Sequence, residues 1–329
     1  MAELKVAIVG LGKMGLLHAS ILNVIPDVEV VALCDTSSVL IRLAKKLFKK
    51  SKLVNDVNKL ADLDINTIYV TTPIPSHYPI LKTIFSMRLI QNIFVEKTLA
   101  SNWIESNELC KLSTKFGSVN MVGYMKRFGV TFNKAKQILL EDVIGNLISF
   151  TAHAYSSDFS KVKQASNKSM SRGGVLSDLG SHVIDLAMWF FGNLEVNSAR
   201  IDSMNYSGSE DIAHFEVKNS KLKGQIHTSW CMDNYRMPAF GLQIKGTHGS
   251  LNVTDYSVEL DLKNKARSTW FKQDLNDTVN FLLGDSEYYR ENKFFVDSIL
   301  KGTNSEPSFT TASKVDYLID QVRQKGEND

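Results

Sequence analysis

Two separated segments of the chain carry side chains that could perform acid–base chemistry. Asp178 and His182 lie four residues apart in an apolar run that ends at Gly192. In a helix this spacing places both side chains on one face. A polar group on a buried helix is costly unless it is paired or functional. The two residues are therefore either a satisfied structural pair or a base with its orienting carboxylate, since an imidazole with an ordinary pKa of ~6.5 suits a base.

Lys97 is the third candidate, because it directly follows an apolar strand pattern at residues 92–95. Most lysines are surface charges. A lysine at the C-terminal end of a parallel strand, however, can lie partly desolvated beside a ligand. There its charge would stabilise an oxygen that becomes negative during a reaction. Both interpretations of Lys97 remain open from the sequence.

The elements that must position these residues differ between the two halves of the chain. The first half alternates strand and helix patterns, which predicts a parallel, doubly wound sheet. The C-terminal ends of such strands line one crevice, where ligands bind. We therefore expect Asp35, the Thr71-Thr72-Pro73 turn and Glu96-Lys97 to converge there. The segment 72–77 holds two prolines, so we expect a rigid turn and not a helix. The predicted strands are 4–9, 28–34, 53–54, 66–70, 92–95 and 118–122; the helices are 13–22, 39–48, 77–87 and 103–115.

The turn after the first strand has the spacing of a dinucleotide-binding motif, Gly10, Gly12 and Gly15. Gly10 permits the tight turn, Gly12 lets the backbone approach a pyrophosphate, and Gly15 lets helix and strand pack closely. A non-binding glycine turn is the alternative. Asp35 ends the second strand, 20 positions after Gly15, where an acid can bind a ribose 2′-hydroxyl. Its charge would repel a 2′-phosphate, so the sequence favours NAD over NADP.

From Gly123 the alternation stops, which predicts two domains, residues 1–122 and 123–329. Strand patterns then dominate and indicate an α+β domain with a large, mostly antiparallel sheet. The polar segment 156–171 is interpreted either as a loop that closes over a substrate or as an ordinary exposed loop. The predicted strands are 194–204, 212–217, 222–230, 240–245, 250–253, 257–262 and 268–271; the helices are 131–140, 176–191, 288–300 and 310–324.

The composition argues against several kinds of partner. The 38 basic and 35 acidic residues leave a formal charge of +3, which gives no electrostatic case for nucleic acid or a membrane. Cys34, Cys110 and Cys231 lack metal-like spacing, and no third residue suitably joins Asp178 and His182, so we expect no metal. No signal-like or spanning apolar run is evident. We therefore expect a cytoplasmic protein.

With these motifs the chain resembles the Gfo/Idh/MocA family of oxidoreductases over nearly its whole length. The glycine turn is similar to that family's opening motif, and Thr72-Pro73 with His77 to its Thr-Pro-x-x-x-His turn. Glu96-Lys97 resembles its Glu-Lys-Pro signature, with Thr98 in place of proline. Further similar landmarks are Gly145-Asn146, the segment 174–182 and Gly246 to Ser250.

The resemblance implies roles for residues in both halves. It implies that Lys97, Asp178 and His182 are catalytic. It implies substrate contacts for Arg127, Tyr155, Arg172 and His182. It implies that the cofactor is lined by Gly10, Gly12, Lys13, Met14, Gly15, Asp35, Thr71, Thr72, Pro73, His77, Glu96 and Lys97.

The resemblance also implies an activity. Most members transfer a hydride between nicotinamide and a carbon of a sugar, polyol or nucleotide-linked sugar. Many are dimers or tetramers, and the predicted sheet has too few helices to cover both faces, so we expect a homo-oligomer. Two alternatives stay open: a reductase of a non-sugar carbonyl or diol, and a non-catalytic dinucleotide-binding regulator.

Overall fold

The computed structural model describes residues 4–87, 91–160, 172–203, 209–275, 277, 279 and 285–327, and divides the chain into two compact units. Unit 1 consists of Met1–Tyr124 and Asn280–Asp316, and unit 2 of Met125–Val279 and Tyr317–Asp329. These units differ from the two continuous domains expected from the sequence. The difference arises because helix α8, Ser286–Leu300, packs against α1, Lys13–Leu22, in unit 1.

Unit 1 is built on a six-stranded sheet in the order β3-β2-β1-β4-β5-β6, with every pairing parallel. The predicted doubly wound parallel sheet is confirmed. Strands β4 and β5 are buried along their whole length, which explains their nearly unbroken apolar sequences. The strands are β1 Leu4–Val9, β2 Val28–Cys34, β3 Lys52–Val54, β4 Thr67–Val70, β5 Asn92–Val95 and β6 Val119–Val122.

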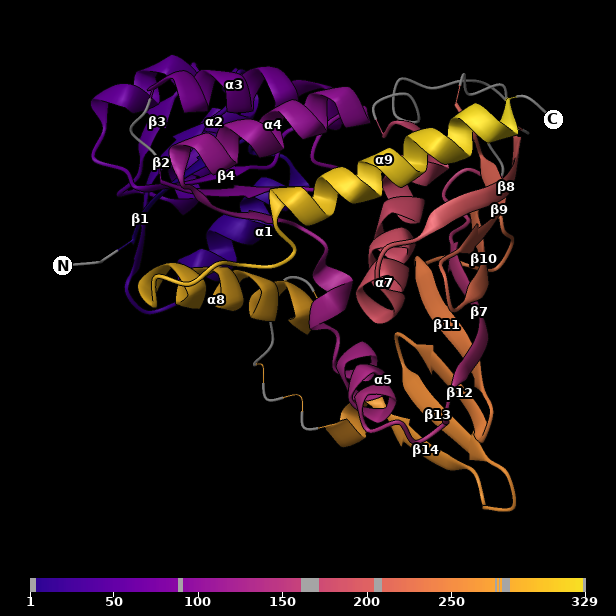
Figure 1. The fold of residues 1–329 in the computed structure, drawn as a ribbon. Coiled ribbons are helices and arrows are strands. Elements are labelled where there is room, and N and C mark those ends of the chain that lie inside the picture. The colour runs from indigo at the N-terminus through magenta and orange to yellow at the C-terminus, as the bar shows by residue number, and fades with distance from the viewer. Residues whose placement is uncertain are drawn as a thin grey trace. The chain divides into compact units, whose positions relative to one another are not determined.

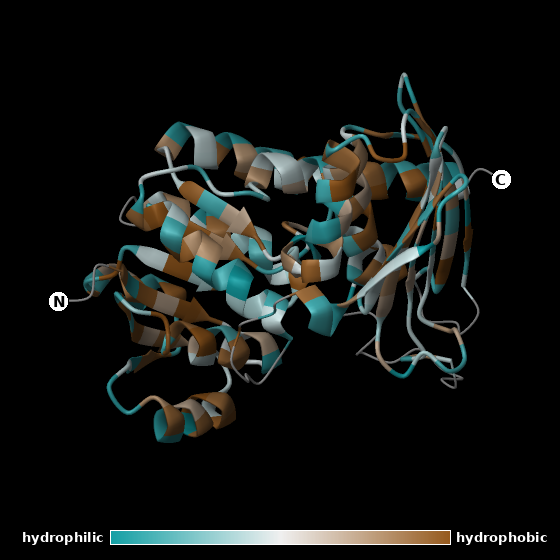
Figure 2. Ribbon diagram, turned by 90° about the horizontal axis from the view of Figure 1, so that it is seen from below, coloured by the Kyte–Doolittle hydropathy of each residue, from teal (hydrophilic) through white to brown (hydrophobic). Residues whose placement is uncertain are grey.

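Helices cover both faces of this sheet (Figure 1). Helices α3, His77–Met87, and α4, Trp103–Phe116, pack together on one face, whereas α1 and α8 lie on the other. Hydrophobic and hydrophilic residues alternate around the helices, as expected of helices with one buried face (Figure 2). The remaining elements of unit 1 are α2 Ser38–Leu47 and the 3₁₀ turns η1 Val57–Asp62 and η2 Ile74–Ser76. The segment expected to be a rigid, non-helical turn therefore contains one short 3₁₀ turn.

Unit 2 is built on an eight-stranded sheet in the order β14-β13-β12-β11-β7-β10-β9-β8. Among the strand pairings of the described residues in this sheet, only that of β7 with β10 is parallel, so the predicted mostly antiparallel sheet is confirmed. Helices α5, Val130–Leu140, and α7, Ser181–Phe191, pack on one face (Figure 1). The other strands are β8 Glu195–Asp202, β9 Ile212–Lys218, β10 Lys223–Ser229, β11 Ala239–Gly246, β12 Gly249–Thr254, β13 Ser257–Leu262 and β14 Ser268–Phe271. The remaining elements are the 3₁₀ turns η3 Met125–Phe128 and η5 Lys272–Leu275, and helix α9 Phe309–Gly326, which runs from unit 1 into unit 2.

Strand β7, Leu147–Tyr155, lies in the middle of this sheet and is missing from the sequence prediction. Its buried residues Phe150, Ala152 and Ala154 alternate with half-buried polar ones, which is the period of a strand with one covered face. That signal was present in the sequence. The small alanines weaken it, because alanine is depleted in strands.

Two further expectations from the sequence concern a polar loop and membrane-spanning segments. The loop expected at residues 156–171 is described only as far as residue 160, and its remainder lies outside the described residues. No helix in the described ranges combines the length and apolar character needed to span a bilayer.

Candidate functional site

The glycine turn of unit 1 is shaped by close backbone packing. Gly10 has φ +96°, and a Cβ atom there would lie 2.8 Å from the backbone of Thr71 and Thr72. A Cβ at Gly15 would lie 1.8 Å from the carbonyl oxygen of Gly10. Both positions therefore exclude any other residue. A Cβ at Gly12 would meet nothing within 4 Å, so this part of the turn borders open space at the start of α1.

The carboxylate of Asp35 is fixed beside this turn. Its Oδ2 accepts a hydrogen bond from the N–H of Leu11 at 2.6 Å, and its Oδ1 accepts one from the N–H of Ser37 at 2.7 Å. A helix N-terminus with open space beside it binds a phosphate group, and an oriented carboxylate binds a ribose hydroxyl. Lys13 is exposed and Met14 is half-buried on the first turn of the same helix. This donor set and this open space fit a dinucleotide.

The turn after β4 is tied to its neighbours on both sides. The hydroxyl of Thr71 donates to the carbonyl oxygen of Gly10 at 2.7 Å. His77 is fully buried, and its ring nitrogens lie 2.8 Å from the carbonyl oxygens of Thr72 and Thr98. Burial lowers the pKa of His77, and the two carbonyls oppose that effect. His77, which the resemblance places at the cofactor, therefore links the loops after β4 and β5. Pro73, which is exposed, lies between Thr72 and η2.

Glu96 and Lys97 lie at the end of β5, as predicted. Glu96 is 8% exposed, and its Oε2 accepts a hydrogen bond from the N–H of Lys97 at 3.2 Å. Lys97 is half-buried, and the peptide bond between Lys97 and Thr98 is cis. Unit 1 thus brings the glycine turn, Asp35, the Thr71–Pro73 turn and Lys97 to the C-terminal edge of one sheet. This edge includes the switch point between β1 and β4.

In unit 2, Asp178 and His182 lie on either side of a change in helix type. Residues Leu176–Gly180 form a π-helical turn, and α7 begins at Ser181. The expected single α-helix is therefore interrupted, and a single π turn of this kind is frequent at functional sites. His182 is 5% exposed, and the edge of its ring meets Phe240 with centroids 5.6 Å apart.

Arg172 connects Asp178 to a second carboxylate, which the sequence analysis did not single out. Its Nη1 donates to Asp178 Oδ2 at 3.0 Å and to Asp158 Oδ2 at 2.7 Å. Burial opposes the charge of Arg172, but Asp178 and Asp158 raise its pKa above the ordinary value. The arginine is 30% exposed in its side chain, so it is accessible beside Asp178.

Arg127, for which the resemblance implies a substrate contact, lies in a buried ion pair. Its Nε donates to Asp185 Oδ2 at 2.7 Å and its Nη2 to Oδ1 at 2.6 Å. The two side chains are 10% and 1% exposed. The signal for this pair was visible in the sequence, because Asp185 lies three residues after His182 in an otherwise apolar helix.

Tyr155, also expected to contact substrate, is directed to the other face of the sheet from α7. Phe150 stacks on Phe191 of α7, whereas Tyr155 stacks on His153, and these odd-numbered residues of β7 share the opposite face. Burial raises the pKa of Tyr155, and Tyr235 adds to the effect. The structure therefore does not bring Tyr155 to the face that carries His182.

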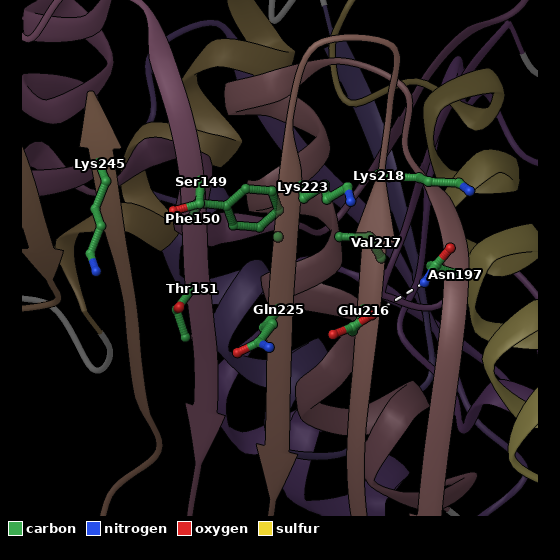
Figure 3. A pocket seen from close by; sticks show the side chains of 11 residues that line it. Ser149, Phe150, Thr151, Asn197, Glu216, Val217, Lys218, Lys223, Gln225 and Lys245 are labelled. Atoms are coloured by element: carbon green, nitrogen blue, oxygen red, sulfur yellow. Dashed lines mark hydrogen bonds between the residues drawn. The ribbon is translucent and has the colours of Figure 1, made fainter. Parts of the chain in front are cut away.

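That opposite face has a shallow polar hollow (Figure 3). Lys218, Lys223 and Lys245 line it, together with Gln225 and Glu216, which accepts a hydrogen bond from Asn197. None of the side chains proposed for acid–base chemistry lines this hollow.

Two family models match the chain. The model described as "Oxidoreductase family, NAD-binding Rossmann fold" matches residues 4–124, and the model of the GFO/IDH/MocA C-terminal domain matches residues 132–252.

Similar proteins include several dehydrogenases. D-glucoside 3-dehydrogenase of Escherichia coli (strain K12) is 27% identical over 64% of this chain, and the match spans 60% of that relative's length. Myo-inositol 2-dehydrogenase of Thermotoga maritima is 23% identical, and the match covers 78% of each chain. A levoglucosan dehydrogenase in complex with NADH and levoglucosan superimposes with a TM-score of 0.88 at 18% identity, over 99% of this chain and 97% of the other. The last similarity shows a shared fold.

Proposed function

The chain belongs to the Gfo/Idh/MocA family of oxidoreductases, and from this premise we propose that it is an NAD-dependent dehydrogenase. It transfers a hydride between nicotinamide and a secondary alcohol or ketone carbon of a sugar, polyol or nucleotide-linked sugar. One observation carries the proposal. Lys97 lies on the same edge of one sheet as the glycine turn and Asp35, which fit a dinucleotide. The sugar and polyol dehydrogenases among its relatives support the substrate class.

The residues of the chain fit the requirements of alcohol oxidation. The reaction needs a base for the hydroxyl proton and stabilisation of the oxygen as it becomes negative. NAD, when bound, supplies the acceptor for the hydride. His182 takes the hydroxyl proton on its imidazole, and Lys97 stabilises the oxygen with its charge. Asp178, held by Arg172, orients the base or the lysine.

Groups of unit 1 would hold the cofactor. The glycine turn and the first turn of α1, with Lys13 and Met14, would bind the pyrophosphate. Asp35 would accept a hydrogen bond from the adenosine ribose. Thr71, Thr72, Pro73 and Glu96 would line the cofactor from the neighbouring loops, which His77 links. Because Asp35 repels a 2′-phosphate, we expect NAD to bind more tightly than NADP.

Two finer points belong to the same proposal. We infer a homodimer or homotetramer joined through the strands of unit 2, because in the described part of the chain α5 and α7 lie on one face of that sheet only. We also infer a cytoplasmic location, which the free thiols of Cys34, Cys110 and Cys231 support.

A substrate panel tests the proposal against its two alternatives. The NAD-loaded protein is incubated with sugars, polyols, nucleotide sugars and simple diols, and absorbance at the NADH band is followed. Turnover of a sugar or polyol supports the proposal. Turnover restricted to simple diols favours the reductase alternative. Cofactor binding without turnover of any compound favours the regulator and contradicts the dehydrogenase.

A further inference from the structure

A buried polar chain runs beneath Lys97 in unit 1. His18 lies on α1 and is fully buried, and its Nε2 lies 2.9 Å from Glu96 Oε1. Its Nδ1 lies 3.0 Å from Oδ1 of Asn292, a buried residue of α8. The second carboxyl oxygen of Glu96 accepts from the N–H of Lys97. Three elements far apart in sequence therefore meet at the residue before Lys97.

The hydrogen-bond partners fix the tautomer of His18. The amide nitrogen of Asn292 donates to the carbonyl oxygen of Tyr288 at 2.7 Å, which can only accept. The amide oxygen of Asn292 therefore faces His18, and this oxygen also can only accept. The Nδ1 of His18 must carry a proton.

This assignment determines what lies between His18 and Glu96. The Nε2 either accepts a proton from a neutral Glu96 or, in the imidazolium form, donates to the carboxylate. In both cases one proton joins Nε2 and Oε1, so the two side chains hold each other in one orientation. Apolar rings prevent water from replacing this contact: Phe94 and Tyr69 pack on the imidazole with centroids 4.9 and 5.6 Å away.

The carboxyl group of Glu96 is also confined on its far side. A Cβ atom at Gly123 would lie 3.2 Å from Glu96 Oε2, so the end of β6 leaves room for this oxygen but for little else. With Oε1 engaged by His18, Oε2 is directed at the N–H of Lys97. The orientation of the Lys97 backbone thus depends on His18 and Asn292.

We propose that His18, oriented by Asn292, is a positioning residue that acts through Glu96 to fix Lys97 for hydride transfer. The inference rests on the catalytic role proposed for Lys97. It assigns no contact between His18 and substrate or cofactor. Its consequence is that the link to Glu96 matters more for turnover than the link to Asn292.

Two substitutions of His18 separate these links. The amide nitrogen of glutamine occupies the place of Nε2, and that of asparagine the place of Nδ1. His18→Gln keeps a donor to Glu96, whereas His18→Asn keeps only the donor to Asn292. We expect His18→Asn to lose about tenfold or more in the rate of hydride transfer, because small misplacements near the reacting groups are costly. We expect His18→Gln to retain most of the rate, with both variants similarly destabilised. Phe295→Leu, a core change beside Tyr69 and Phe94, is the packing control. It should lower the stability of the protein and leave the rate of hydride transfer unchanged.

The test combines stopped-flow rates with a measurement that needs no turnover. Imidazole ¹⁵N NMR of the full chain should show His18 protonated at Nδ1, and Glu96→Gln should shift the Nε2 signal while the Nδ1–H persists. Equal rates for His18→Asn and His18→Gln, or an unprotonated Nδ1, would overturn the positioning role. If the unsubstituted protein transferred no hydride with any compound of the panel, the dehydrogenase proposal would fail instead, and with it the role in hydride transfer. The NMR result would still decide the tautomer and the His18–Glu96 link.

Discussion

The carboxylate of Asp35 shows how a single residue can set cofactor preference. It is held by two backbone N–H groups, so it cannot swing away from a 2′-phosphate without losing both bonds. We expect Asp35→Ser to narrow the preference for NAD over NADP by about tenfold or more, because a like charge at contact distance is removed. Titration calorimetry with both cofactors measures the ratio. Glu29→Ser removes an exposed acid from β2, the strand that Asp35 follows, and should leave the ratio unchanged. Tighter NADP binding by the unsubstituted protein would refute the assignment.

The buried ion pair of Arg127 and Asp185 stabilises the fold only while both partners are present. Breaking a buried ion pair leaves an uncompensated charge and typically costs about 3–5 kcal/mol. We expect Arg127→Met to lower the free energy of unfolding by that order, and Arg127→Met/Asp185→Leu to recover much of the loss. Urea denaturation measures both. If the double variant were as unstable as the single one, packing and not charge would explain the effect.

His77 gives the fold a specific dependence on pH. Burial is the main cause that lowers its pKa below 6.5, so the unfolded chain binds its proton more readily than the folded one. Its contribution is therefore fully present above pH 6.5 and is lost as the pH falls through the lowered value. We expect stability to decline on acidification from pH 7. Urea denaturation across this range should show a shallower decline for His77→Gln than for the unsubstituted protein. The decline should persist in part, since two half-buried histidines with lowered pKa values, His153 and His227, remain. An identical decline would exclude His77 as a cause.

At the scale of elements, the start of the π-helical turn depends on one glycine. Gly174 has φ +83°, and a Cβ there would lie 2.3 Å from Glu210 Oε1. Glu210 in turn accepts from Arg323 at 2.9 Å and from the N–H of Leu176 at 3.2 Å. Gly174→Ala should therefore cost more than the roughly 1–3 kcal/mol of backbone strain alone. Gly117→Ala, with φ +65° and open space around it, measures the strain alone in the same unfolding experiment. Equal losses would show that Glu210 is not displaced.

The sequence predicted those elements whose signals are local. The glycine turn, strands β1 and β5 and helix α3 have the predicted bounds, because period, turn residues and apolar runs define them. It did not predict what long-range packing decides. The π turn before α7 has the sequence of an α-helix. The return of α8 to unit 1 depends on contacts such as His18 with Asn292, which are 274 positions apart.

The candidate site was predictable to a similar extent. The sequence predicted that Lys97, Asp35 and the glycine turn lie together at strand ends, because strand ends in a parallel sheet converge by topology. The partners of the side chains were not predictable from the sequence, since Arg127 could bind an anionic ligand as readily as it binds the carboxylate of Asp185. The face on which Tyr155 lies was not predictable for a simpler reason: strand β7, which directs this side chain, was itself missed, and strand parity decides which face a side chain occupies.

For the whole molecule, we expect copies of the chain to associate through the sheet of unit 2. If copies associate through the exposed face of its sheet, an added positive charge in the hollow that Lys218, Lys223 and Lys245 line should weaken association (Figure 3). We expect Gln225→Lys to shift the protein toward monomer, and Lys314→Gln, on α9, to leave it unchanged. Sedimentation velocity at micromolar concentration measures this. A monomeric unsubstituted protein would contradict the homo-oligomer.

In the proposed mechanism Lys97 stabilises the reacting oxygen and does not merely hold the cofactor. Lys97→Met keeps a similar length and removes the charge, so its effect should fall on the transition state. Removing such a group costs about 10²–10³ in rate. Lys111→Met, an exposed lysine of α4, serves as the control.

The most direct measurement is stopped-flow hydride transfer by Lys97→Met, made beside a titration of NAD. The proposed role predicts a fall of about 10²–10³ in the transfer rate, while NAD affinity changes little. Transfer at a near-normal rate, or failure of Lys97→Met to bind NAD, would contradict it.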